Sequence, residues 1–151
     1  SQTSNNNTRA MAILARMFAA EMQFMESSQE DFSGLAAIFH PDIVVHEPAS
    51  LPYAGDWRGH QSLGRLFKSM RDAWSNMNVE HIRATIDDDT LFMCCTLVAT
   101  SRNSGEEIRQ PFAEVLRIES GLVIEGTPYY YDTAAIDAAL GHNSLGTKGS
   151  K

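Results

Sequence analysis

Hydrophobic residues recur along the first half of the chain at the three- and four-residue spacing of α-helices. This spacing predicts helices over about 8–25, 27–40 and 60–77. Pro41 ends the second helix, because proline cannot continue the hydrogen-bond ladder. The first seven residues are polar and rich in asparagine, and we expect them to fray. Three N-terminal helices are therefore expected.

Alternating hydrophobic and polar residues then predict β-strands, most of them in the second half. The runs of this kind cover 42–47, 79–87, 90–101, 106–119 and 122–131, and the segment 49–59 is expected to be a loop. A short helix is expected over 133–140, and the Gly, Ser and Lys residues of 142–151 predict a disordered tail. Residues 1–141 thus read as one α+β domain, in which a strongly bent sheet packs its concave face on the helices and leaves a conical pocket.

Composition and charge narrow the function. The 151 residues are 43% hydrophobic and 21% charged, which is typical of one globular domain. The net charge of −7 argues against a nucleic-acid partner, and no apolar run is long enough to span a membrane. Cys94 and Cys95 are adjacent and leave a strand on opposite faces, which excludes a disulfide framework and favours a reducing, cytoplasmic location.

The familiar cofactor and metal motifs are missing. The segment 141–148 has neither the spacing of a phosphate-binding loop nor that of a nucleophile elbow. His46 and Glu47 begin like a zinc-protease motif, but the second histidine is absent. The five histidines show no ligand spacing, so we expect no metal and no cofactor.

A carboxylate interrupts the hydrophobic face of the strand over 106–119. Side chains on a strand alternate between faces, which places Glu114 in one row with Phe112, Leu116 and Ile118. A buried carboxylate is costly unless it is paired, hydrogen-bonded or protonated. We expect it to face a cavity; the alternative is an ion pair with Arg58, Arg83 or Arg109.

Other polar candidates lie at strand ends. Glu47 and His46 end the first strand, and Asp132 follows the last one. Asp132 could equally act as the N-cap of the last helix, and His46 could be a core histidine bonded to a carbonyl.

Aromatic residues surround these candidates. Three consecutive tyrosines at 129–131 bring hydroxyls that need partners, which a pocket satisfies more easily than a dry core. A plain aromatic core is the alternative. The residues expected to contact a small hydrophobic ligand are Tyr53, Trp57, Phe67, Trp74, Phe112, Tyr129 and Tyr131.

Two stretches resemble a known superfamily. The run Phe39-His40-Pro41-Asp42-Ile43-Val44-Val45-His46-Glu47-Pro48, then Trp57-Arg58-Gly59, and the segment 113–140 are similar to the ketosteroid isomerase-like branch of the nuclear transport factor two-like superfamily. SnoaL-type polyketide cyclases and limonene epoxide hydrolases belong to the same group. The likeness covers about 11–140, and it implies a cone-shaped curved sheet wrapped around three helices and a homodimer.

The resemblance also implies roles for single residues. Glu47, before a proline, stands where ketosteroid isomerases hold their proton-shuttling aspartate. Glu114 falls at their protonated, hydrogen-bond-donating aspartate, the acid that the apolar site keeps neutral. Their oxyanion tyrosine falls near Gln23 or Phe24, so this chain departs from them there. Steroid-type isomerisation is therefore not expected unless Tyr53 or a tyrosine of 129–131 takes its place.

Asp132 sits in a Tyr-Tyr-Asp stretch that is similar to the end of the epoxide hydrolases. Their activating Arg-x-Asp pair would fall near Cys95 and Leu97, and both partners are missing. Epoxide hydrolysis is therefore the less favoured activity, whereas a cyclase could use Glu114 or Asp132.

These observations predict a pocket protein for a small hydrophobic molecule. We expect carboxylate acid/base chemistry of isomerase or cyclase type on a carbonyl compound, with Glu47 as base and Glu114 as protonated donor, oriented by His46 and tyrosine hydroxyls. The alternatives are a non-catalytic binding module and a domain whose filled pocket leaves the sheet to serve assembly. For a dimer contact, the expected strand face carries Val79, His81, Arg83 and Thr85.

Overall fold

The computed structural model describes residues 1–27 and 31–141 of the chain. The expected disordered tail, 142–151, and the expected start of the second helix near Ser28 lie outside these residues. The helices are α1 (Gln2–Glu26), α2 (Ser33–Ala36), α3 (Gly59–Ala73) and α4 (Thr133–Ala139), and the strands are β1 (Phe39–Glu47), β2 (Gly55–Arg58), β3 (Trp74–Asp87), β4 (Thr90–Ser101), β5 (Glu107–Glu119) and β6 (Leu122–Tyr130).

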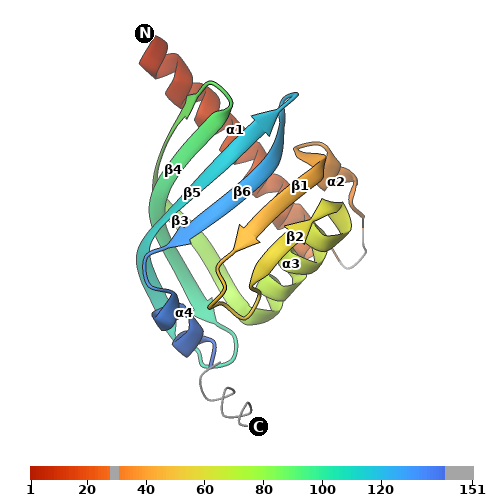
Figure 1. The fold of residues 1–151 in the computed structure, drawn as a ribbon. Coiled ribbons are helices and arrows are strands. Elements are labelled where there is room, and N and C mark those ends of the chain that lie inside the picture. Colours follow the sequence, from red (N-terminus) through yellow and green to blue (C-terminus); the bar gives the residue numbers. More distant parts are fainter. Residues whose placement is uncertain (28–30, 142–151) are drawn as a thin grey trace.

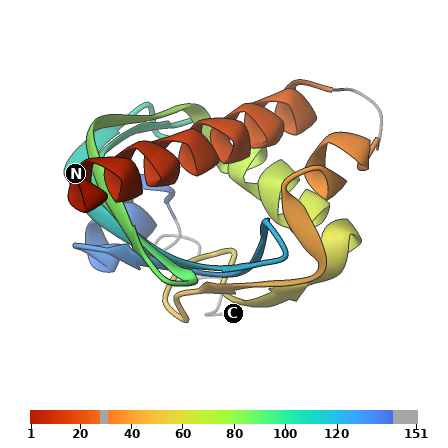
Figure 2. The same ribbon diagram turned by 90° about the horizontal axis from the view of Figure 1, so that it is seen from above.

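The strands form a six-stranded sheet in the order β2-β1-β6-β5-β4-β3. Strand β1 pairs in parallel with β6, and the other pairs are antiparallel. The sheet curves strongly, and α1 and α3 cross its concave side, as Figures 1 and 2 show. The expected α+β architecture with a curved mixed sheet is confirmed.

Helix α1 begins earlier than its hydrophobic pattern indicates. Ser1 is its N-cap and accepts a hydrogen bond from the Ser4 amide at 3.2 Å, so the polar residues before Thr8 are helical rather than frayed. Among the described residues, none of the helices is long and apolar enough to cross a membrane.

The third predicted helix ends four residues early. Trp74 and Met77 keep their apolar spacing but belong to β3, where they pair with Ser101 and Ala99 of β4. The side chain of Arg102 donates to the carbonyls of Arg71 and Trp74 at 2.9 and 3.0 Å, which satisfies acceptors that the end of α3 leaves open.

The region around the first strand also differs from expectation. Of the helix expected over 27–40, the described residues keep only α2, and β1 starts at Phe39. Pro41 lies inside β1, where the pairing register with β6 shifts between Phe39 and Val44, so its missing N–H breaks no regular ladder. Strand β2 forms within the segment that was expected to be a loop.

A β-bulge divides the face of β3 that was expected to form a dimer contact. The register shifts between Glu80 and Arg83, and His81 takes a positive φ of 56°. Because the extra residue reverses the alternation, Val79 lines the internal cavity whereas Arg83 stands opposite the exposed Cys94. The expectation that Val79, His81, Arg83 and Thr85 share one face was wrong.

Candidate functional site

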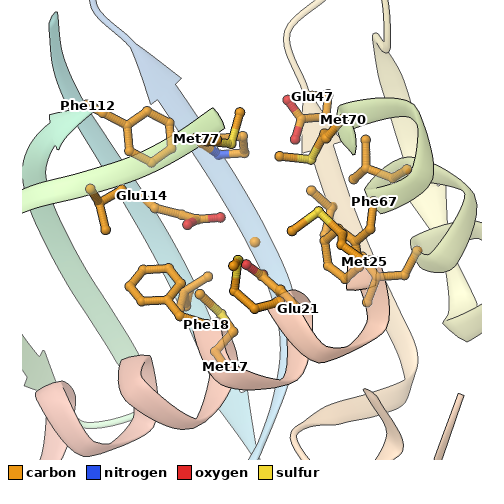
Figure 3. Close-up of a pocket in the computed structure, with 18 of the residues that line it drawn as sticks. Met17, Phe18, Glu21, Met25, Glu47, Phe67, Met70, Met77, Phe112 and Glu114 are labelled. Atoms are coloured by element: carbon orange, nitrogen blue, oxygen red, sulfur yellow. The ribbon is translucent and has the colours of Figure 1, made fainter. Parts of the chain in front are cut away.

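A cavity of about 290 Å³ lies between α1, α3 and the concave face of the sheet (Figure 3). Its volume falls near the lower limit of small-molecule sites, which run from roughly 300 to 1,000 Å³. Its walls are apolar apart from three glutamates, Asn78 and the hydroxyl of Tyr130.

The three glutamates come from three different elements. Glu21 projects from α1, Glu47 ends β1 and Glu114 lies in the middle of β5, and their carboxyl groups point into the same space (Figure 3). Strand alternation turns Glu47 and Glu114 inward, together with Val45 and Leu116, which also line the cavity.

Glu114 forms no hydrogen bond or ion pair with another side chain in the part of the chain that the structure describes. Arg58 pairs instead with Asp56 at 3.2 Å, and Arg109 with Glu80 at 2.8 Å. Arg83 stands opposite the exposed Cys94, so none of the three arginines named from the sequence forms an ion pair with Glu114 among the described residues. Burial without a cation raises the pKa of Glu114 to about 7.

Gly126 on β6 lies next to this carboxyl group and also lines the cavity. Gly126 stands opposite Leu116. A Cβ atom at this position would lie 3.3 Å from the Leu116 Cδ2 atom and 3.5 Å from the Glu114 Oε2 atom. A Cβ atom here would therefore crowd Leu116, while it would make only an ordinary van der Waals contact with the Glu114 carboxyl group.

Glu47 is more deeply buried than its place before a loop indicates. The residue is only 8% exposed. Burial, and then the charge of Glu114, raise its pKa to about 8, so the expectation that Glu47 stays ionised was wrong. The Tyr130 hydroxyl donates a hydrogen bond to Glu47 Oε1 at 3.4 Å, which opposes this rise.

Tyr130 is supported by buried aromatic residues behind the cavity wall. The Trp74 indole N–H donates to the Tyr53 hydroxyl at 3.1 Å, and the Tyr53 hydroxyl in turn interacts with that of Tyr130. The Trp57 indole N–H donates to the backbone carbonyl of Tyr53 at 3.1 Å. Tyr53 and Trp74 therefore position the Tyr130 hydroxyl beside Glu47, and Trp57 supports Tyr53. None of these three residues lines the cavity.

Glu21 was not among the residues expected to line the pocket. Burial, followed by the charges of Glu114 and Glu47, raises its pKa well above the usual value. The signal that could have found it is helical spacing. Glu21 is four residues after Met17 and four before Met25, and all three line the cavity.

His46 and Asp132 lie away from the cavity. Alternation turns His46 to the outer face, where Nδ1 and Nε2 each lie 2.7 Å from carboxylate oxygens of Asp56 and Glu125. Asp132 is exposed and caps α4, since its Oδ1 accepts from the Ala135 amide at 3.0 Å.

The aromatic candidates divide into residues that line the cavity and residues that are exposed at the surface. Phe67 and Phe112 line the cavity, whereas Tyr129 and Tyr131 are 56% and 77% exposed. Tyr130 takes the inward position because it pairs with Phe112, and the centroids of the two rings lie 5.0 Å apart.

The described residues offer no place for a bound metal. No three of their His, Cys, Asp or Glu side chains converge closely enough to hold an ion. Among the same residues, no Lys, Arg or His lines the cavity.

Comparisons with known proteins agree with this architecture. The model of the SnoaL-like domain matches residues 14–126, which confirms the resemblance seen in the sequence. An NTF2-like protein of Burkholderia xenovorans is 19% identical, with a TM-score of 0.75 over 89% of this chain and 97% of its own. A candidate SnoaL-like polyketide cyclase of Jannaschia sp. CCS1 is 13% identical, with a TM-score of 0.68 over 89% and 94%. A search of curated proteins finds no match.

Proposed function

This chain belongs to the SnoaL-like domain family, and on that premise we propose that its cavity performs acid/base chemistry on a small hydrophobic carbonyl compound. The observation that carries the proposal is Glu114, an unpaired carboxyl group in an apolar cavity whose pKa is raised to about 7. A general base works best with a pKa near the operating pH.

In the proposed reaction, Glu114 acts as the base and Glu47 as the hydrogen-bond donor. Near neutral pH the Glu114 carboxylate takes a proton from the carbon next to the carbonyl group. Glu47, whose pKa is raised to about 8, keeps its proton and donates a hydrogen bond to the carbonyl oxygen, which stabilises the enolate. These roles are the reverse of those expected from the sequence, because Glu47 is buried and because the charge of Glu114 raises its pKa further.

The enolate then has two outcomes. In an isomerisation, Glu114 returns the proton to a different carbon. In a cyclisation, the enolate carbon attacks a second carbonyl carbon of the same molecule, and Glu114 gives its proton to the oxygen of that carbonyl, which closes a ring. Positioned proton transfer contributes about 10²–10⁴-fold and a well-placed donor about 10²–10³-fold. The solved structure of a candidate polyketide cyclase with the same fold supports the second outcome.

Deuterium exchange at the carbon next to the carbonyl of 2-tetralone tests the proposal, with NMR as the readout. We expect exchange above the buffer rate, with a bell-shaped pH profile that rises near pH 7 as Glu114 ionises and falls near pH 8 as Glu47 loses its proton. Glu114→Gln should slow exchange by about 10²-fold or more, and Glu47→Gln by about 10²-fold.

Glu107→Gln is the matched control, because Glu107 lies on the same strand but is exposed. Equal exchange in the wild type, both cavity variants and this control would remove the catalytic proposal. Thermal stabilisation by 2-tetralone that survives both cavity substitutions, without exchange, would instead identify the non-catalytic binding module.

The chain is further proposed to act as a cytoplasmic homodimer. Two free thiols, Cys94 on the exposed face and Cys95 on the buried face of β4, support a reducing compartment. Exposed apolar side chains on the outer face of the sheet, which include Phe92 and Tyr129, support self-association.

A further inference from the structure

The proposed chemistry needs two carboxyl groups, and the cavity holds three. Glu21 projects from the helix wall, opposite the sheet that carries Glu114, and the proton transfer described above does not use it (Figure 3). Like Glu114, it forms no hydrogen bond or ion pair with another side chain among the described residues. The third carboxyl group therefore needs a separate explanation.

The charges of the lining do not balance. Three acidic side chains face the space, and no basic side chain among the described residues does. Burying a carboxylate away from water without a cation is unfavourable, so the empty cavity favours the protonated form of each of these groups. The missing positive charge is a property that a ligand could supply.

The rest of the wall suits a cation with an apolar body. Aromatic faces attract cations through their ring quadrupole, and thioethers are polarisable surfaces that adapt to apolar groups. The aromatic lining residues are Phe18, Phe39, Phe67, Phe112 and Tyr130, and five methionines, Met17, Met22, Met25, Met70 and Met77, complete much of the wall.

We propose that the cavity binds a small hydrophobic amine as its ammonium ion, with Glu21 as the principal counter-ion. The amine nitrogen lies against the Glu21 carboxyl group, where the nearby charges of Glu114 and Glu47 also favour a cation. Its hydrocarbon part lies against the methionines and aromatic rings. This inference concerns binding alone, so it stands whether or not the ligand is turned over.

Binding of the ammonium ion should release protons. A cation next to a carboxyl group favours its ionised form, so a group that is protonated in the empty cavity gives up its proton on binding. The affinity for the amine should therefore rise with pH until the carboxyl groups are ionised in the free protein. A neutral ligand of the same shape releases no proton, so its affinity should not rise with pH in this way.

Isothermal titration calorimetry with 4-phenylbutylamine and 4-phenyl-1-butanol tests the proposal, because the two probes differ only in the polar group. Titrations in phosphate and in Tris buffer count the protons released. We expect the amine to bind about tenfold or more tightly than the alcohol at neutral pH, with release of about one proton, while the alcohol releases none.

Substitutions then assign the counter-ion. Glu21→Gln should weaken amine binding about tenfold and leave alcohol binding unchanged, while Glu21→Asp, which keeps the charge, should retain most of the preference. Glu26→Gln is the matched control, because Glu26 lies on the same helix and is exposed. It should bind both probes like the wild type.

Three results would overturn the proposal. The first is alcohol binding as tight as amine binding in the wild type, and the second is an equal loss for both probes in Glu21→Gln. The third is the absence of binding for both probes. Because none of these titrations measures deuterium exchange, their failure leaves the result for 2-tetralone, and with it the proposed function, standing separately.

Discussion

The chemistry of the cavity depends on the environment of single carboxyl groups. Glu47 and Glu114 are ordinary glutamates in the sequence, but burial raises their pKa values to about 8 and about 7. Near neutral pH such a pair holds both an ionised and a protonated carboxyl, which is the requirement for a base and an acid in one site. The usual pKa of 4.5 would leave both groups ionised.

Glu114→Gln should stabilise the protein at high pH. The pKa of Glu114 in the folded protein lies above its usual value. Its contribution to the free energy of unfolding is therefore fully present below about pH 4.5 and is lost as the pH rises to about 7. Glutamine does not ionise, so the variant does not lose this stability as the pH rises. We expect its free energy of unfolding at pH 8 to exceed that of the wild type by up to about 3 kcal/mol, with little difference at pH 4.

Urea denaturation at the two pH values measures this effect. Glu107→Gln should match the wild type at both. A variant that is equally destabilised at pH 4 and pH 8 would show that Glu114 has a structural role rather than an unpaired charge.

At the scale of elements, His46 joins three strands on the outer face of the sheet. Its ring nitrogens lie 2.7 Å from Asp56 on β2 and 2.7 Å from Glu125 on β6, and His46 itself belongs to β1. A neutral imidazole has only one N–H, so donation to both carboxylates requires the protonated ring. The hydrogen bond to Asp56 contributes most to a raised pKa of His46, and that to Glu125 adds to it.

His46→Gln should therefore weaken the sheet edge in a pH-dependent manner. A histidine with a raised folded-state pKa contributes stability that is fully present below about pH 6.5 and is lost as the pH rises through the raised value. We expect the variant to lose less than about 1 kcal/mol at pH 6, because the side chain is partly exposed, and to approach the wild type at high pH.

The measurement is the difference between the two unfolding free energies as a function of pH. His81→Asn serves as the control, because His81 is exposed and asparagine accepts its positive φ. A constant difference across the pH range would contradict a protonated His46 between the two carboxylates.

At the scale of the whole molecule, one face of the sheet has no covering element in the described part of the chain. Its neighbouring side chains form two cross-strand rows, Phe92-Val115-Thr127 and Cys94-Ala113-Tyr129. Phe92 is 46% and Tyr129 is 56% exposed. Contiguous apolar side chains at a surface favour association, which is the basis of the homodimer proposed above.

Sedimentation equilibrium should then give twice the chain mass of 16.7 kDa. Phe92→Asp should shift the protein to the monomer, because a charge on the apolar face opposes its burial between two copies. Met22→Asp should leave the dimer intact, because Met22 is an exposed residue of α1 on the concave side of the sheet. A monomeric wild type at high concentration would reject the assembly.

Much of this architecture is accessible from residue patterns. Alternation along β5 is enough to place Glu114 in an apolar row, and the order of the elements predicts the curved α+β fold. The boundaries of helices and strands are harder to predict from the sequence. Trp74 and Met77 have spacing that suits a helix, but pairing with β4 makes them strand residues. Local periodicity reports which side chains share a face, and it does not report which neighbour the backbone will pair with.

The sequence by itself determined the periodicities of the elements, the class of fold and the anomalous carboxylate on β5, because these depend on residues that are close along the chain. Only the tertiary structure decided that Glu21 joins Glu47 and Glu114 in one cavity, and that Tyr130 rather than its neighbours faces them. These facts depend on how distant elements meet across the concave face of the curved sheet, and on the register that places Tyr130 opposite the inward-facing Phe112.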